Sequence, residues 1–165
     1  MKYTMTYQSP LGEILLAADD NGLTGLWFSG AKYYGRGLGR EHEGKNVPVF
    51  EEARRWLDIY FSGKEPDFMP PVHMTGTPFQ IEVWEVLRRI PYGRTMTYGE
   101  IAKKLAGEGG LSEMSARAVG GAVGHNPVSV IVPCHRVVGA DGSLTGYAGG
   151  IDRKIRLLML EGRIT

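Results

Sequence analysis

The sequence predicts an α/β (α+β) protein with two domains, a small antiparallel sheet with one helix followed by a mostly helical domain. Three observations predict it. Two turn-forming spacers, the second ending in Asn21-Gly22, separate three short strand-like segments. An apolar pattern with helical spacing follows them. A Pro-rich connector at residues 66–71 then precedes several short helical patterns, so we place the domains at residues 1–75 and 76–165.

The first domain is expected to be a meander followed by a helix. Its strands are predicted at residues 3–7, 14–17 and 23–28. Residues 29–46 are rich in glycine and charge and should form an irregular loop. Apolar residues about one helical turn apart predict a helix over residues 47–61, with its aromatic side chains in the core. No residue pattern in this half indicates a catalytic or binding site.

The second domain contains two short helices. Thr97 and Glu100 form a predicted capping box at the start of the first helix. The second is expected from about Ser115 and consists of small residues with one long charged side chain, Arg117. Such a pair is the plan of a helix-turn-helix, although the small residues could equally serve tight helix packing. The other predicted elements are a helix from Thr77-Pro78, a turn at 139–143, and a helix at 153–161 with Ile155, Leu158 and Met159 inward.

Composition excludes several classes of protein. One cysteine in 165 residues permits neither an internal disulfide nor a cysteine-cluster metal site, and a reduced thiol suits the cytoplasm. No apolar run approaches the roughly 18 to 20 residues of a membrane span, so we expect no membrane partner. Residues 1–75 carry 8 Lys/Arg and 10 Asp/Glu, whereas residues 76–165 carry 11 and 8. The basic excess in the second half is compatible with a nucleic-acid partner.

Cys134 is the candidate nucleophile. It follows an apolar run, residues 128–132, that predicts a buried strand, and it precedes His135. A thiolate is the nucleophilic form of cysteine, so a neighbouring imidazole suggests activation. A lone cysteine is also commonly a small buried hydrophobe, and both interpretations stay open at this point. Adjacent residues of an extended segment point to opposite faces, so His135 can act only if the chain turns sharply after Pro133.

Four segments resemble the O6-alkylguanine-DNA alkyltransferase family, whose members are also called methylated-DNA-protein-cysteine methyltransferases. The segments are residues 7–12, 117–122, 126–138 and 146–150. The similarity covers nearly the whole chain and favours a nucleophilic Cys134. It implies a ribonuclease H-like first domain and a winged helix-turn-helix second domain.

The resemblance also implies the activity. A protein of this family would turn O6-alkylguanine, or O4-alkylthymine, out of double-stranded DNA and transfer the alkyl group irreversibly to Cys134. Because the chain has no second thiol to accept the group, each molecule should act once. The implied partner is duplex DNA, bound through the minor groove by a monomer. No cofactor and no metal are implied.

The same resemblance assigns roles to individual residues. Glu161 would orient His135, which takes the thiol proton through a water molecule. Tyr98 would donate to the leaving purine, and Asn126 would brace the turns around the site. The residues implied to line the substrate are Val137, with its carbonyl, Tyr147, as a wall beside the alkyl group, and Ala148, with its amide toward O6. The residues implied to bind DNA are Arg117, inserted into the base stack, and Ala116, Ala118, Gly120 and Gly121 along the groove.

Some assignments stay open in the sequence. Arg136 is expected to pack or pair structurally, and Lys154 is either a solvated charge or a member of the site. The turn at residues 107–114 is longer than in compact family members. One alternative is a non-catalytic module that recognises alkylated guanine and recruits other repair proteins, but such relatives lack the reactive cysteine. A cysteine hydrolase is a second alternative, for which the sequence shows no oxyanion motif.

Overall fold

The computed structural model describes residues 2–39, 42–107 and 116–162. Its elements are β1 (Lys2–Ser9), β2 (Gly12–Asp19), β3 (Gly22–Phe28), β4 (His42–Gly44), α1 (Pro48–Phe61), α2 (Pro78–Arg88), β5 (Met96–Thr97), α3 (Tyr98–Gly107), α4 (Ala116–Gly124), the 3₁₀ helix η1 (Cys134–Arg136), β6 (Val137–Val138) and α5 (Ile151–Leu160). They form two compact units. One contains Met1–Thr75 and Pro127–Ile131, and the other contains Gly76–Asn126 and Val132–Thr165.

The sheet of the first unit has the strand order β3-β2-β1-β4. Strands β1, β2 and β3 form the predicted antiparallel meander. Within the loop expected to be irregular, β4 pairs in parallel with β1 instead. Gly22 closes the second turn with a φ of 151°, and a Cβ there would lie 2.8 Å from the carbonyl oxygen of Pro71. Glycine is therefore required where the connector passes the sheet edge.

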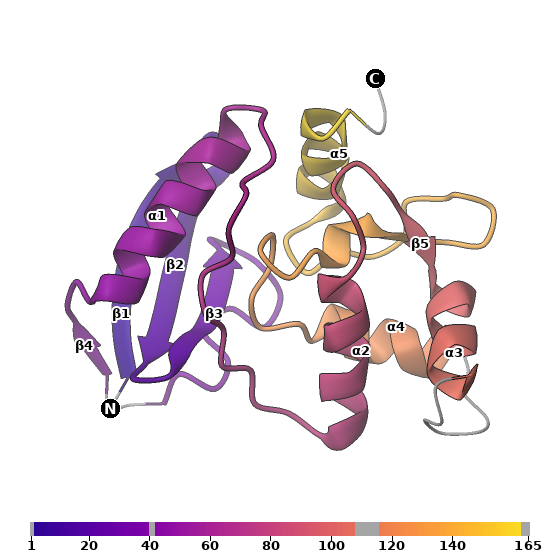
Figure 1. Cartoon of the computed structure of the whole chain (residues 1–165), viewed down its shortest axis with the longest axis horizontal. Helices are drawn as coiled ribbons and strands as arrows, with labels where there is room; N and C mark the ends of the chain where they lie inside the picture. The colour runs from indigo at the N-terminus through magenta and orange to yellow at the C-terminus, as the bar shows by residue number, and fades with distance from the viewer. Residues whose placement is uncertain (1, 40–41, 108–115, 163–165) are drawn as a thin grey trace. The chain divides into compact units, whose positions relative to one another are not determined.

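Helix α1 covers one face of this sheet (Figure 1). Pro48 occupies its first turn, where the missing N–H costs nothing. The predicted apolar spacing is confirmed by the residues that α1 buries, namely Phe50, Ala53, Trp56, Leu57 and Tyr60. These side chains and the buried face of β2 and β3 form the core of the first unit.

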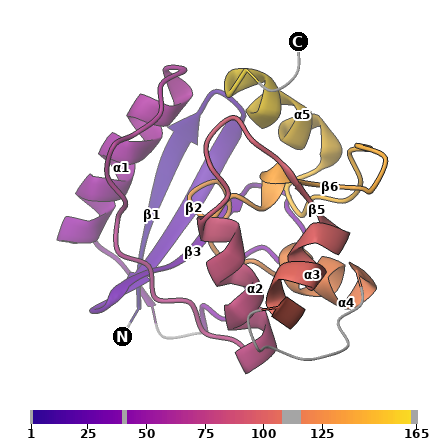
Figure 2. The same cartoon turned by 45° about the vertical axis from the view of Figure 1, so that its right-hand side comes forward.

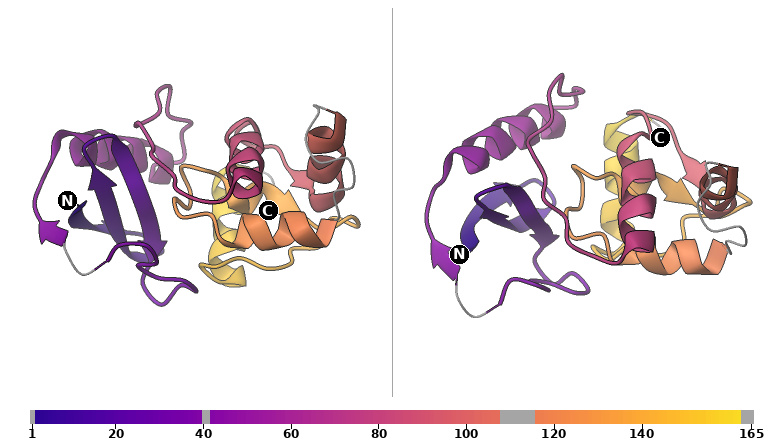
Figure 3. Two further views of the ribbon diagram at one scale, coloured as in Figure 1. Left: turned by 90° about the horizontal axis from the view of Figure 1, so that it is seen from below. Right: turned by 60° about the horizontal axis from the view of Figure 1, so that its bottom comes forward.

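In the second unit, α2 supports the two short helices. Thr77 caps α2 with the reciprocal bonds of a capping box, in which Gln80 is the partner. Trp84 of α2 donates through Nε1 to the carbonyl of Ala122 at 2.9 Å, which ties α2 to α4 (Figure 3). Thr97 and Glu100 make both bonds of the predicted capping box at the start of α3. The expected long turn and Ser115 lie outside the described residues.

A short parallel pair, β5 and β6, joins the helices to the segment that follows Cys134 (Figure 2). The predicted turn at residues 139–143 is present, with Gly139 N donating to Ser143 O at 2.8 Å. Helix α5 buries Leu158 as expected, but Met159 is 47% exposed and the prediction that it points inward is wrong. The inward face of α5 is taken by Leu157, Leu158 and Lys154.

The predicted strand over residues 128–132 is also wrong. Only Val128 pairs with the sheet, through an isolated bridge to β3. Ile131 N then donates to Ser129 O at 2.8 Å across Val130, whose φ is 69°. That i to i+2 bond makes a γ-turn, a strained conformation for a β-branched residue. The run is buried, as its composition predicts, but it turns instead of extending.

Among the residues that the structure describes, no helix is both long enough and apolar enough to cross a membrane.

Candidate active site

A tight turn places Cys134 at the start of η1. Pro133 has φ −81° and ψ 68°, and Cys134 N donates to Val132 O at 2.8 Å across it. This inverse γ-turn supplies the sharp bend that His135 needs, because the following residues are helical and not extended. Cys134 is 5% exposed. The chain therefore holds its one thiol just below the surface, in a segment with well-defined hydrogen bonds.

His135 and Glu161 form a buried pair. Nε2 of His135 lies 2.7 Å from Oε2 of Glu161, and neither side chain is exposed. Glu161 follows the last residue of α5, so that helix carries the carboxylate to the histidine. Burial opposes ionisation of Glu161, but hydrogen bonds from His135 and Arg136, together with the charge of Arg136, outweigh it and lower its pKa to about 2. Glu161 is therefore a carboxylate, and we assign the Nε2 proton to His135.

Burial lowers the pKa of His135 below its usual range. Glu161 opposes this shift, while the charges of Arg136 and Lys154 reinforce it. A neutral imidazole that donates through Nε2 accepts a proton at Nδ1. The pair therefore has the protonation state of a general base held by an orienting carboxylate.

Lys154 and Tyr98 form a second cluster. The Lys154 side chain is fully buried, and Nζ donates to the carbonyls of Val137 at 2.6 Å, Thr145 at 3.0 Å and Gly146 at 3.2 Å. Burial lowers its pKa to about 8, and the Cys134 charge opposes that shift. The possibility of a solvated lysine is thus wrong. One ammonium joins the strand after the cysteine to the glycine-rich loop.

Tyr98 stands at the first position of α3, directly after the β5 residue that pairs with β6. Its hydroxyl donates to Thr145 O at 3.2 Å. Burial raises the pKa of Tyr98; the bond to Thr145 opposes the shift, and the Cys134 charge adds to it. The hydroxyl therefore keeps its proton at neutral pH and can act as a donor close to the thiol.

Asn126 lies at one end of the segment Pro127–Ile131 and closes it. Its side-chain amide donates to Val132 O at 2.8 Å, and the residue is 5% exposed. This bond holds the end of α4 at the residue that begins the turn into Cys134. The bracing role of Asn126 stays a prediction, and this hydrogen bond is the contact through which it would act.

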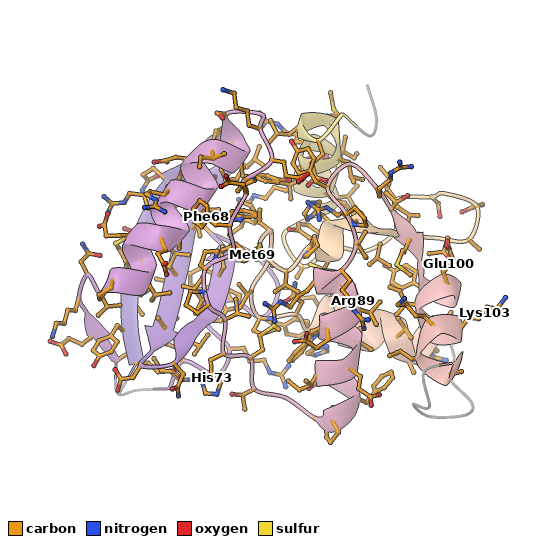
Figure 4. The ribbon with its side chains drawn as sticks, viewed as in Figure 1. Phe68, Met69, His73, Arg89, Glu100 and Lys103 are labelled. Carbon is orange, nitrogen blue, oxygen red and sulfur yellow. The ribbon has the colours of Figure 1, made fainter. Side chains whose placement is uncertain are left out.

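Helix α4 is short, and Arg117 is its one long charged side chain. Arg117, Ala116, Ala118 and Gly121 are all exposed, whereas Gly120 is half-buried. A Cβ on Gly120 would meet the Tyr98 ring at 3.7 Å, and one on Gly121 would meet none of the described residues within 4 Å. The Gly120 side of α4 therefore faces the second cluster, and the Gly121 side is open. On the neighbouring α3, Lys103 extends outward (Figure 4).

The residues implied to line the substrate follow β6 or belong to it. Val137 is fully buried, and its carbonyl is the one that Lys154 bonds at 2.6 Å. Tyr147 and Ala148 are half-buried and follow directly on Gly146, the last carbonyl that Lys154 holds. Lys154 thus sets the course of the loop just before these two residues.

Three contributors to the site were not assigned to it from the sequence. Arg136, Lys154 and the backbone N–H of Gly93 all bond groups of the two clusters. A signal for Lys154 is its position three and four residues before Leu157 and Leu158, which places it on the apolar face of α5. The sequence gives no signal for Gly93, because it contributes a backbone N–H, which residue type does not reveal. In the described part of the chain, no three His, Cys, Asp or Glu side chains gather as a metal site requires.

Fold and site together define the class. Two short helices packed on each other, α3 and α4, a buried cysteine and a histidine-carboxylate pair within one unit indicate a nucleic-acid-modifying enzyme with a thiol nucleophile.

Comparison with known proteins gives the family. The family model described as the ribonuclease-like domain of 6-O-methylguanine DNA methyltransferase matches residues 1–74, and the model of its DNA binding domain matches residues 78–163. The methylated-DNA--protein-cysteine methyltransferase of Methanosarcina acetivorans is 45% identical over 160 residues, covering 97% of this chain and 98% of the relative.

Two solved structures from Mycobacterium tuberculosis are similar in fold as well. OGT in complex with DNA has a TM-score of 0.83 and 43% identity, covering 96% of this chain and 92% of that one. The O6-methylguanine methyltransferase has a TM-score of 0.82 and 42% identity, covering 100% and 96%. The resemblance and the fold class predicted from the sequence are confirmed. The chain belongs to the 6-O-methylguanine DNA methyltransferase family.

Proposed function

We propose that this chain repairs double-stranded DNA by taking the alkyl group from O6 of guanine onto its own Cys134, once per molecule. The enzyme class follows from the family: the chain is a methylated-DNA-protein-cysteine methyltransferase. The observation that carries the residue assignment is the buried His135–Glu161 pair at 2.7 Å, adjacent in sequence to the one thiol.

The reaction is a displacement at carbon. Nδ1 of His135 takes the thiol proton through a water molecule, and the thiolate attacks the alkyl carbon. The new bond is a thioether, and the bond that breaks joins that carbon to O6. The electron pair of the broken bond moves into the purine, and the Tyr98 hydroxyl donates a proton to the purine as it leaves. Without a donor, guanine would leave as an anion in a site with little water, which costs several kcal/mol.

The alkylated base must leave the duplex before sulfur can reach it, because a stacked base exposes only its edges. We place α4 in the minor groove, where the open backbone at Gly121 permits close approach and Arg117 takes the place of the displaced base. Tyr98, on the far side of Gly120, then faces the base that has turned out. The protein acts as a monomer in the reducing cytoplasm, where its thiol stays available.

The test is to incubate the protein with a duplex containing one O6-methylguanine and to weigh the intact protein. We expect a gain of one methyl group, located on Cys134 by peptide mapping, with yield limited to one per molecule. Cys134→Ala is the matched control and should gain nothing. Multiple turnovers would overturn the single-use reaction.

The same measurement separates the alternative function. A recognition module would bind the lesion duplex tightly and show no adduct. Since the chain has Cys134 beside a base of the right protonation state, we expect the adduct. Binding without a mass change would therefore replace the proposed reaction by recognition alone.

A further inference from the structure

Arg136 is a buried cation, and every nitrogen of its guanidinium donates a hydrogen bond. Nε and NH2 donate to Oε1 and Oε2 of Glu161 at 2.9 and 3.1 Å, and NH1 donates to Ile90 O at 2.7 Å. The guanidinium carbon also lies 5.6 Å from the ring centre of Tyr92. Arg136 thus connects the chain after α2 to the carboxylate at the end of α5.

Arg136 leaves the Glu161 carboxylate little freedom to rotate. Oε1 accepts from Arg136 and from Gly93 N at 3.0 Å, and Oε2 accepts from Arg136 and from His135 at 2.7 Å. Four donors match the roughly four lone-pair sites of a carboxylate. The two parallel bonds of a guanidinium fork fix a carboxylate plane better than one bond can. Removing the fork would free the group that orients His135.

The charge of Arg136 matters as much as its geometry. A carboxylate by itself draws a proton onto a neighbouring imidazole, and an imidazolium cannot accept the thiol proton. Arg136 balances that carboxylate through direct contacts at 2.9 and 3.1 Å. Within the described part of the chain, Glu161 favours the imidazolium form of His135, and the charges of Arg136 and Lys154 oppose it.

We propose that Arg136 is a positioning residue for alkyl transfer, which turns Glu161 toward His135 and keeps His135 neutral so that it can take the Cys134 proton. This rests on the proposed function only where the alkyl-transfer rate is concerned. Its effect on the protonation of His135 stands independently. A purely structural ion pair would contribute to folding without changing how His135 titrates.

The experiment compares wild type with Arg136→Lys, which keeps the charge, and Arg136→Met, which keeps much of the volume. Arg156→Met removes an exposed arginine of the same unit and is the matched control. The full-length proteins are labelled with ¹⁵N-histidine, and the ring of His135 is followed by NMR against pH among the chain's 4 histidines. Benzyl transfer from O6-benzylguanine is measured over the same pH range.

In wild type we expect a neutral His135 with its proton on Nε2 at pH 7. In Arg136→Met we expect the ring to take up a proton at a pH higher by about one unit or more, and the acid limb of the transfer rate to move the same way, about tenfold in rate per unit. Arg136→Lys should titrate close to wild type. Identical titration in wild type and Arg136→Met would overturn the proposal.

Two further variants test the proposal if Arg136→Met does not fold. Glu161→Gln leaves Arg136 opposite an uncharged amide, and the double variant Glu161→Gln/Arg136→Met removes both charges. His135 should take up its proton at higher pH in the double variant than in Glu161→Gln. Equal titration of the two would overturn the proposal, whereas absence of any wild-type adduct would overturn the proposed function alone.

Discussion

The hydroxyl of Tyr98 donates to the carbonyl of Thr145 at 3.2 Å, and the same carbonyl accepts from Nζ of Lys154 at 3.0 Å. The hydroxyl that we propose as donor to the leaving purine is therefore held by the loop that precedes Tyr147. When a base arrives, Tyr98 can exchange its partner without leaving Thr145 unsatisfied, because Lys154 continues to bond that carbonyl. Tyr98 can therefore change its hydrogen-bond partner with little loss of hydrogen-bond energy.

The first prediction concerns this tyrosine. Tyr98→Phe keeps the ring against Gly120 but removes the donor, so transfer from O6-benzylguanine should slow about 100-fold, as for loss of an acid catalyst. Folding stability should fall by only about 1 kcal/mol, the usual net value of one hydrogen bond. The rate is followed by intact mass and the stability by urea unfolding. A rate equal to that of wild type would exclude Tyr98 as donor.

A second prediction uses the low pKa of Glu161. This pKa is about 2 in the folded protein against an ordinary value of 4.5. The carboxylate thus stabilises the fold fully above about pH 4.5, and this contribution is lost as pH falls toward 2. The unfolding free energies of wild type and Glu161→Gln should differ most near neutral pH and converge in acid. A constant difference across this range would contradict the assignment.

Arg117 gives a third prediction. Arg117→Ala should lower the rate of methyl removal from duplex DNA at least about tenfold more than the rate with free O6-benzylguanine, because only the duplex leaves a gap in the stack. Arg156→Ala removes the same charge from α5, at an exposed position, and should change the two rates equally. Both substrates are measured under single-turnover conditions at one salt concentration. Equal losses on the two substrates would argue against insertion by Arg117.

Gly121 provides a fourth prediction, in which stability and repair move in opposite directions. No atom of the residues that the structure describes lies within 4 Å of a Cβ built there, so Gly121→Ala should stabilise the fold by up to about 1 kcal/mol through helix propensity. Gly121→Leu should also fold, yet it should weaken binding to duplex DNA because its side chain holds α4 away from the groove. Thermal unfolding and a duplex titration measure the two effects. Tight duplex binding by Gly121→Leu would place α4 elsewhere.

Local patterns in the sequence predict most of the fold. Turn-forming spacers locate the meander, and helical spacing with Pro48 or Thr77 at the start locates α1 and α2. The strand expected over residues 128–132 fails because composition reports burial, while the positive φ of Val130 depends on what surrounds it. Strand β4 is missed because its three exposed residues carry no apolar pattern.

For the site, the sequence identifies the residues near Cys134 but not the forces that hold them. His135 and Glu161 were predicted as partners, and the structure brings them together at 2.7 Å. Lys154 and Arg136 are charged residues, and residue type alone favours the surface for both. Only the folded chain provides the carbonyls and the carboxylate that make their burial favourable. Buried charges of this kind depend on partners distant in sequence, which spacing cannot reveal.

The path of the chain around Asn126 has a consequence for biosynthesis. The sheet of the first unit is synthesised within the first 44 residues, yet the N–H of Leu26 on β3 bonds Pro127 O at 2.8 Å. About 80 further residues must therefore be synthesised before this sheet edge is complete. Val132, which accepts from Asn126, emerges from the ribosome immediately after that edge is filled. The edge of the sheet is thus completed only a few residues before the turn that leads into Cys134 is synthesised. Cys134 therefore enters its hydrogen-bonded turn late in translation.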